Sequence, residues 1–288
     1  MVDVYVTSAF SKNNSGGNKA GIVLEDYNLK AKDKMELAKK LGYSETAFLS
    51  SSRYADYKIE YFTPTEEVPL CGHATIAAFV TLGHLNRLSK SSYTIETRAG
   101  ILKIMLDDHG MIFMEQNKPV FYETLVKADL SSCFDLDIIS PKLPIQIVST
   151  GLRDILIPID NIKNLKETIA NLNFIANISK DKNVVGVHAF SLTDTGEVTA
   201  LCRNFAPLYG IDEESATGTS NCALACYLFK YGLKQKRYVF EQGHNLQNIS
   251  QIVVNIESKD DIITSVMVGG YGYIVCKKTL GTYPFSIE

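Results

Sequence analysis

Residues 61–85 read YFTPTEEVPLCGHATIAAFVTLGHL, and this stretch decides how the rest of the chain is interpreted. It begins with an apolar segment closed by Pro64, passes through an acidic loop, and turns at Gly72 into a small, apolar run. This order predicts a strand, a loop and a buried helix. The first N–H groups of a helix have no partner inside it, and the helix dipole makes that end attractive to anions. The sequence therefore predicts an anion-binding helix start beside Cys71, Gly72 and His73.

The chain contains a second stretch with the same order of features. Residues 201–233 read LCRNFAPLYGIDEESATGTSNCALACYLFKYGL. A Phe-x-Pro again precedes an acidic loop, Gly218 again opens an apolar helix, and Gly232 closes it. Such a repeat predicts two similar halves, each presenting one helix start. If the halves face each other, the two helix starts would serve one cleft. The alternative is two unrelated strand–loop–helix units.

Composition excludes several classes of protein. The 288 residues carry a net charge of −3 and no basic block, which argues against a nucleic-acid partner. There is no signal-peptide pattern at the N-terminus and no apolar run long enough to cross a membrane. The six cysteines lack paired spacing, so we expect them to be reduced and the protein to be cytoplasmic.

The alternation of strands and helices predicts an α+β fold of two β-rich halves, each wrapped around one apolar helix. Residues 117–127 show no clear periodicity and include Pro119, so we place the boundary between the halves there. The expected halves are residues 1–118 and 119–277, with residues 278–288 able to complete the first. Further expectations are a helix over 31–41 stopped by Gly42, a helix over 162–175, and strands over 265–268 and 271–277.

Five motifs, in order over nearly the whole chain, are similar to those of the phenazine-biosynthesis PhzF-like family. They are GYSETAF at 42–48, FTPTEEVPLCGHAT at 62–75, RNFAP at 203–207, ATGT at 216–219 and EQG at 241–243. The family shares the fold of diaminopimelate epimerase. The resemblance therefore implies two barrel-like halves around central helices, with the active site between them. It also implies an isomerase that needs no cofactor, acts on a small carboxylated metabolite and often forms a homodimer.

The resemblance assigns acid–base roles to three side chains. Glu45 would move a proton between carbons of the substrate, assisted by His73 and Glu214. A carboxyl beside the apolar residues 47–49 is expected to be partly desolvated, which suits acid–base catalysis. Without the resemblance, Glu45 would be read as a solvated surface residue and His73 as a helix-capping one.

Four further residues are expected to bind the substrate. Gly72, Gly218 and Thr219 would offer backbone N–H groups to its carboxylate, and Ser44 stands beside the proposed base. On the sequence alone, the two glycines are equally compatible with ordinary turns.

Two positions depart from the family pattern. Residues 213–219 read EESATGT where the family usually has Glu-Asp-Pro-Ala-Thr-Gly-Ser, so Glu214 is one methylene longer than the usual Asp. Asn248 stands where the family often has Arg. Both departures bear on which substrate is used more than on the fold.

Two other functions remain open on this sequence. A racemase of the same fold would use two facing thiols; Cys71 occupies the first position, but Thr217 occupies the second and has no usable pKa near neutrality. A non-catalytic protein that binds a small acid is the other. We expect no metal, because Cys71 and His73 have no second ligand pair at zinc-like spacing, and no nucleotide, because no glycine-rich signature follows a strand.

Overall fold

The computed structural model describes residues 1–25, 27, 29–130 and 132–281. Its contacts divide the chain into two compact units. Of the described residues, the first unit comprises 1–115 and 269–281, and the second comprises 116–268. No helix in the described ranges is long and apolar enough to cross a membrane.

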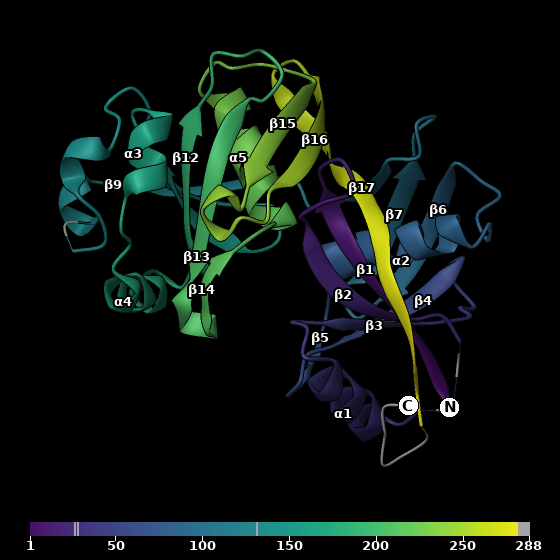
Figure 1. The fold of residues 1–288 in the computed structure, drawn as a ribbon. Coiled ribbons are helices and arrows are strands. Elements are labelled where there is room, and N and C mark those ends of the chain that lie inside the picture. The colour runs from purple at the N-terminus through teal and green to yellow at the C-terminus, as the bar shows by residue number, and fades with distance from the viewer. Residues whose placement is uncertain (26, 28, 131, 282–288) are drawn as a thin grey trace. The chain divides into compact units, whose positions relative to one another are not determined.

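The first unit is built mainly from strands, with one surface helix and one buried helix (Figure 1). Its elements are β1 (Val2–Ser11), β2 (Asn18–Val23), α1 (Ala31–Leu41), β3 (Thr46–Ser50), β4 (Tyr57–Phe62), β5 (Glu67–Val68), α2 (Gly72–His84), β6 (Ser92–Thr97), β7 (Gly100–Leu106), β8 (Ile112–Glu115) and the last part of β17 (Ile262–Leu280). The helix expected over 31–41 is confirmed, and Gly42 ends it in the left-handed conformation at φ 72°.

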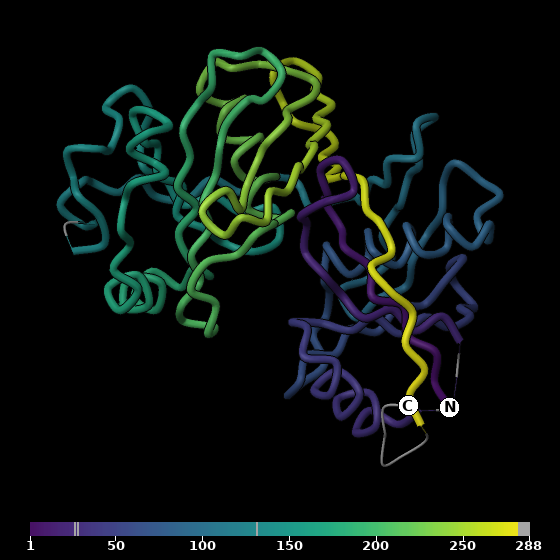
Figure 2. Tube along the Cα trace, in the orientation of Figure 1, coloured from purple at the N-terminus to yellow at the C-terminus, as the bar shows by residue number. Residues whose placement is uncertain are grey.

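The strands of this unit close into a barrel. Among the described residues, β1 pairs with β2, β2 with β3, β3 with β4, β4 with β6, β6 with β7 and β7 with β8. Strand β17 then pairs with both β8 and β1, which returns the ring to its start. The tube in Figure 2 shows the end of β17 running alongside β1. A closed ring leaves no free sheet edge.

Helix α2 is buried by this barrel on all of its faces. Every residue from His73 to Phe79 is buried, and the helix packs against β1, β2, β3 and β8. Seven consecutive buried positions cover the full circumference of a helix. This is why its sequence is mostly small or apolar, with no polar stripe along one face.

The second unit repeats the plan with an added layer of short helices. Its elements are β9 (Val120–Leu125), η1 (Lys127–Leu130), η2 (Leu136–Ile138), β10 (Ile145–Ser149), β11 (Arg153–Pro158), α3 (Ile162–Glu167), α4 (Leu172–Lys182), β12 (Gly186–Leu192), β13 (Ala200–Ala206), η3 (Pro207–Tyr209), β14 (Ile211–Glu214), α5 (Gly218–Lys230), β15 (Arg237–Gln242), η4 (His244–Leu246), β16 (Ser250–Lys259) and the first part of β17. Helix α5 is buried continuously from Ser220 to Phe229.

Strand pairing shows that the two units are duplicates. In the first, β2 is parallel to β3, β3 antiparallel to β4, β4 parallel to β6, and β6 antiparallel to β7. In the second, the same sequence of directions links β11, β12, β13, β15 and β16. Helices α2 and α5 each have 13 residues and occupy the same place in this order. The α+β fold expected from the sequence repeat is therefore confirmed.

Three expectations about local structure were wrong. The segment 117–127 contains a strand, β9, which pairs with β10. The helix expected over 162–175 is two helices, because Thr168 is extended and the Asn171 side chain accepts from the Phe174 N–H to start α4. The strands expected over 265–268 and 271–277 are one strand, β17, because Gly269 does not turn the chain.

Gly269 also explains why the C-terminal boundary differs from the one expected at 277. A Cβ at this position would lie 2.3 Å from the Phe113 ring, so glycine permits β17 to pack closely on β8. The strand therefore joins the first barrel from Gly269, well before residue 278. The N-terminal boundary falls after Glu115, close to the expected 118.

Candidate active site

Glu45 lies at a fixed point between α1 and β3. Gly42 stops the helix, and the Gly21 N–H donates to the Glu45 carbonyl at 3.3 Å. The next residue, Thr46, is fully buried and pairs with both Gly21 and Phe62. The backbone that carries Glu45 is thus held on both sides by the barrel, while its side chain remains 20% exposed.

The start of α2 is held by a pair of buried hydroxyls. Thr75 donates its Oγ1–H to the Cys71 carbonyl at 2.7 Å, and the Tyr61 hydroxyl lies 2.6 Å from the same oxygen of Thr75. Tyr61 is 1% exposed, in strand β4. These contacts fix the turn into the helix and hence the direction of the His73 side chain.

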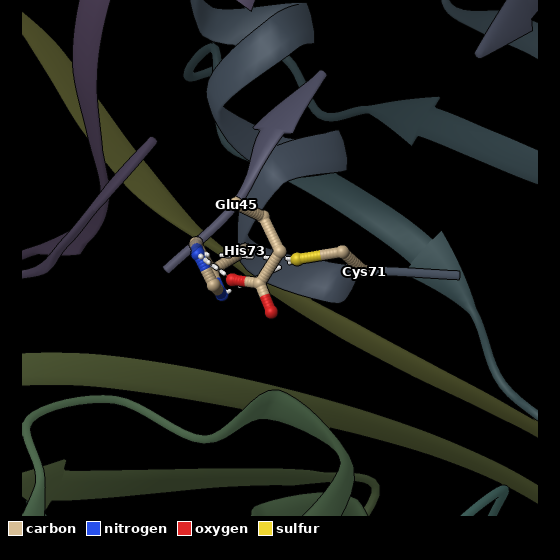
Figure 3. Close-up of side chains that lie close together, drawn as sticks. All are labelled: Glu45, Cys71 and His73. Atoms are coloured by element: carbon tan, nitrogen blue, oxygen red, sulfur yellow. Dashed lines mark hydrogen bonds and ion pairs between the residues drawn. The ribbon is translucent and has the colours of Figure 1, made fainter. Parts of the chain in front are cut away.

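Glu45, Cys71 and His73 lie together at this point (Figure 3). Glu45 Oε2 is 3.3 Å from His73 Nε2, and Cys71 Sγ is 3.5 Å from Nδ1 and 3.9 Å from Nε2. The His73 side chain is only 9% exposed. A carboxylate, an imidazole and a thiol therefore form one compact group. The motif at residues 62–75 contains the imidazole and the thiol but not the carboxylate.

The Glu45 oxygen nearest to His73 has no hydrogen bond. Oε2 is shielded from solvent, and no described residue donates to it, although His73 Nε2 is within ion-pair distance. A shielded carboxylate oxygen without a donor is costly, so a ligand or an ion is expected to supply its missing partner. On the other side of the ring, Asn18 Nδ2 lies 3.4 Å from His73 Nδ1.

The first residue of α2, Gly72, borders open space. The N-cap residue of the helix, Cys71, is extended and makes no side-chain cap. A Cβ added to Gly72 would meet no atom within 4 Å, and φ of Gly72 is not positive. Neither backbone strain nor packing therefore requires glycine at this position.

In the second unit, the corresponding helix start is clamped by amides. Thr217 Oγ1 donates to Glu214 Oε2 at 2.8 Å, and Gln242 Nε2 donates to Thr217 Oγ1 and to the Glu214 carbonyl. Asn221 Nδ2 donates to Gln242 Oε1 and to the Thr217 carbonyl, both at 2.9 Å. This network fixes both the backbone and the carboxylate of Glu214.

Helix α5 also starts without a side-chain cap. Threonine is a favoured N-cap residue, but the Thr217 hydroxyl donates to Glu214 rather than accepting from the helix. The backbone angles of Thr217, φ −126° and ψ 98°, resemble those of Cys71, φ −141° and ψ 114°. The two units thus present the same kind of uncapped helix start, at Gly72 and at Gly218.

The remaining expected residues lie near these groups within their own units. Ser44 is exposed, next to Glu45 in sequence. Thr219 is half-buried, and its carbonyl accepts from the Thr150 hydroxyl at 3.1 Å. Asn248 contacts the turn at Gly243, to whose carbonyl its N–H donates.

Comparison with known proteins identifies the family of this chain. The model of the phenazine biosynthesis-like protein family, PhzC-PhzF, matches residues 7–278. The chain belongs to this family. An uncharacterized isomerase of Clostridium acetobutylicum is 31% identical over 96% of this chain and 97% of its own. The uncharacterized isomerase YddE of Escherichia coli is 31% identical, with coverage of 94% and 96%.

A solved structure agrees as well. The PhzF-family protein of Bacillus anthracis superposes with a TM-score of 0.88 at 28% identity, covering 96% of this chain and 97% of its own. The expectations of a PhzF-like chain and of an isomerase are confirmed by these relatives.

Sequence reasoning missed one polar network in this PhzF-like chain. The Ser220 hydroxyl donates to Asp154 Oδ2 at 2.8 Å and accepts from Asn204 Nδ2 at 3.2 Å, and the same Nδ2 lies 3.2 Å from His188 Nδ1. All four side chains are buried, directly behind the start of α5. The only signal was that polar residues interrupt apolar strands, which does not say that they meet.

Burial dominates the protonation of this network. Desolvation raises the pKa of Asp154 to about 7, although the hydrogen bond from Ser220 acts in the opposite direction. Desolvation lowers the pKa of His188 to about 3, so this ring is neutral at physiological pH. The network therefore supports the helix start with mostly uncharged groups.

A second missed contact distinguishes the two adjacent glutamates of the acidic loop. Arg203 forms a two-pronged ion pair with Glu213, at 2.9 and 2.8 Å, and also donates to the carbonyls of Leu165 and Thr168. Glu213 is thereby part of the framework, whereas Glu214 is held at the helix start by Thr217.

Proposed function

We propose that this protein is a cofactor-independent isomerase that moves a proton between carbons of a small carboxylated metabolite. Glu45 is the acid–base group, and His73 is its polar partner. The backbone N–H groups at Gly72 bind the substrate carboxylate. Glu214, Ser44, Gly218 and Thr219 are included in the proposal as assisting and binding residues.

Two neighbouring features carry the proposal. One is the Glu45 oxygen that has no hydrogen-bond donor, and the other is the start of α2, which has no side-chain cap. Glu45 Oε2 has no hydrogen-bond donor and lies 3.3 Å from the imidazole at the first turn of α2. A carboxylate bound at that turn would gain unpaired N–H donors and the favourable end of the helix dipole. It would also bring the carbon next to it close to Glu45.

The chemistry requires no added electrons. Glu45 in its ionised form removes a proton from one carbon, and the electron pair of that C–H bond is delocalised into the substrate. The protonated Glu45 then returns the proton to another carbon, which regenerates the carboxylate. A correctly placed general acid–base group of this kind contributes about 10²–10⁴-fold to the rate.

The experiment that tests the proposal is incubation of small carboxylic acids with the protein in D2O, followed by mass spectrometry. A substrate is recognised by enzyme-dependent gain of deuterium at carbon. The proposal expects the Glu45→Gln variant to lose this gain. Full turnover by that variant would show that Glu45 does not carry the proton.

Racemisation or epimerisation through Cys71 is the second candidate, because its Sγ lies 3.5 Å from a ring nitrogen of His73. A thiol beside an imidazole can act as a base. Thr217, in the second position of such a pair, offers only a hydroxyl, and it is hydrogen-bonded to Glu214. Deuterium gain at the α-carbon of an amino acid, lost in Cys71→Ser and kept in Glu45→Gln, would favour this candidate.

A further inference from the structure

We propose that Glu45, Cys71 and His73 form a reversible three-ligand site for Zn²⁺. Among the described residues they are the one group of three such side chains whose ligand atoms all lie within 4.8 Å of one another. From the sequence we expected no metal, since only Cys71 and His73 are close in the chain and Glu45 lies far from both.

Two of the three ligand-to-ligand distances are close to those of a tetrahedral zinc centre. With the usual Zn–N, Zn–O and Zn–S bond lengths, ligand atoms stand about 3.4 Å apart for nitrogen and oxygen and about 3.6 Å for nitrogen and sulfur. The observed separations are 3.3 Å between His73 Nε2 and Glu45 Oε2 and 3.9 Å between Nε2 and Cys71 Sγ. The ligand atoms of Glu45 and Cys71 lie within 4.8 Å of each other, so rotation about side-chain torsions would complete the site.

The unsatisfied oxygen of Glu45 gives an independent reason for a cation at this point. Oε2 is shielded and has no hydrogen-bond donor, so a cation there would supply its missing partner. The cluster is not sealed, since Glu45 retains 20% of its side-chain exposure and the space beside Gly72 is open. Three protein ligands leave a fourth coordination position free.

The ligand types select zinc over the abundant hard cations. A thiolate and an imidazole are suited to Zn²⁺, whereas Mg²⁺ and Ca²⁺ favour oxygen ligands. When Nε2 binds the metal, Nδ1 carries the ring proton and requires an acceptor. Asn18, at 3.4 Å from Nδ1, provides one if its amide is turned to present Oδ1.

Zinc at this site would inhibit the isomerase. It occupies the oxygen of Glu45 and the ring of His73 that carry the proposed proton transfer, and binding releases the thiol proton of Cys71 to solvent. This inhibitory consequence rests on the proposed function; the binding itself does not.

The test uses Co²⁺ as a spectroscopic substitute for Zn²⁺ with the full chain under reducing conditions. A cobalt–thiolate bond gives an intense charge-transfer band in the near ultraviolet, which we expect at one Co²⁺ per chain and displaced by Zn²⁺ but not by Mg²⁺. Loss of a residue that only hydrogen-bonds a metal ligand costs about 10–100-fold in metal affinity. Cys71→Ser removes a ligand itself, so it should abolish the band and weaken Zn²⁺ binding by more than about 100-fold. Asn18→Ala should weaken binding without removing the band.

Cys276→Ser is the matched control, because Cys276 is the partly exposed cysteine of β17 and lies outside the cluster. It should bind cobalt as the unchanged protein does. Absence of the band, its persistence in Cys71→Ser, or its loss in Cys276→Ser would overturn the proposal. The cobalt band is measured without turnover. A protein that fails to bind metal can therefore be distinguished from a protein that fails to transfer the proton.

Discussion

The carboxylate of Glu45 and the imidazole of His73 lie 3.3 Å apart, although one precedes a strand and the other begins a helix. The barrel brings them together by pairing β2, β3 and β4 in order and enclosing α2. Oε2 of Glu45 has no hydrogen-bond donor among the described residues, so the His73 ring is its nearest polar neighbour in the group.

Glu45→Gln should retain the fold and lose activity. The amide has the size of the carboxylate but cannot take up a proton, so deuterium exchange should fall by at least about 100-fold. Circular dichroism would check the fold and mass spectrometry the exchange. Glu66→Gln is the control, because Glu66 is an exposed residue of the nearby acidic loop, and this change should leave exchange intact. Equal losses in the two variants would contradict the assignment.

Gly72→Ala should separate binding from stability. A methyl group there meets nothing within 4 Å, so stability should stay the same or rise by up to about 1 kcal/mol. The methyl group would obstruct the approach of a carboxylate to the helix start, and loss of one charged hydrogen bond of about 1.5 kcal/mol raises KM about ten-fold. Unchanged KM would argue against carboxylate binding at this turn.

The contrasting variant is Gly243→Ala. This glycine has φ 86°, and a Cβ would lie 2.3 Å from the Asn248 carbonyl oxygen, so we expect a loss of stability of more than about 1 kcal/mol. Thermal unfolding of both variants measures the difference. A Gly72→Ala protein destabilised as much as Gly243→Ala would show that Gly72 is needed for folding.

The adjacent residues Glu213 and Glu214 should respond differently to the same change. Glu213→Gln leaves Arg203 without its carboxylate in a mostly buried place, at a cost of about 3 kcal/mol. Glu214→Gln keeps an oxygen to accept from Thr217, so stability should change little. It removes the carboxylate that is proposed to assist catalysis, so turnover should fall. Urea unfolding and steady-state kinetics would measure both, and reversal of this pattern would contradict the proposed roles.

Asp154→Asn should change how stability depends on pH. The folded pKa of Asp154 is about 7, above its ordinary value of 3.8. Between these values the unfolded chain releases the proton that the folded chain keeps, so this group makes the protein less stable as pH rises. Above about pH 7 the penalty is fully present, at about 1.4 kcal/mol for each unit between the two pKa values, as an upper bound.

Asparagine at this position has no proton to lose and keeps an acceptor for Ser220. The stability of the variant relative to the unchanged protein should therefore increase as pH rises through this window. Urea unfolding at several pH values measures it, with the exposed Asp194→Asn as control. A constant difference across the window would mean that Asp154 is ionised in the folded state.

The elements that matched their predictions are those with strong local signals. Helix α1 spans Ala31–Leu41 and is stopped by Gly42, as expected. The failures lie where local pattern is weak or misleading: β9 becomes a strand through pairing with β10, and Gly269 serves close packing against Phe113 rather than a turn. Local sequence does not report such contacts between distant segments.

The sequence by itself determined the duplicated plan, the two apolar helices and the acid–base side chains to examine, because periodicity, glycine turns and repeated motifs are local properties. Only the tertiary structure decided that Glu45 meets Cys71 and His73, that Gln242 and Asn221 clamp the loop of Glu214, and that Asp154 is buried behind α5. These contacts join residues distant in the chain. Strand pairing and the burial of each helix set them, and neither can be read from the spacing of residues.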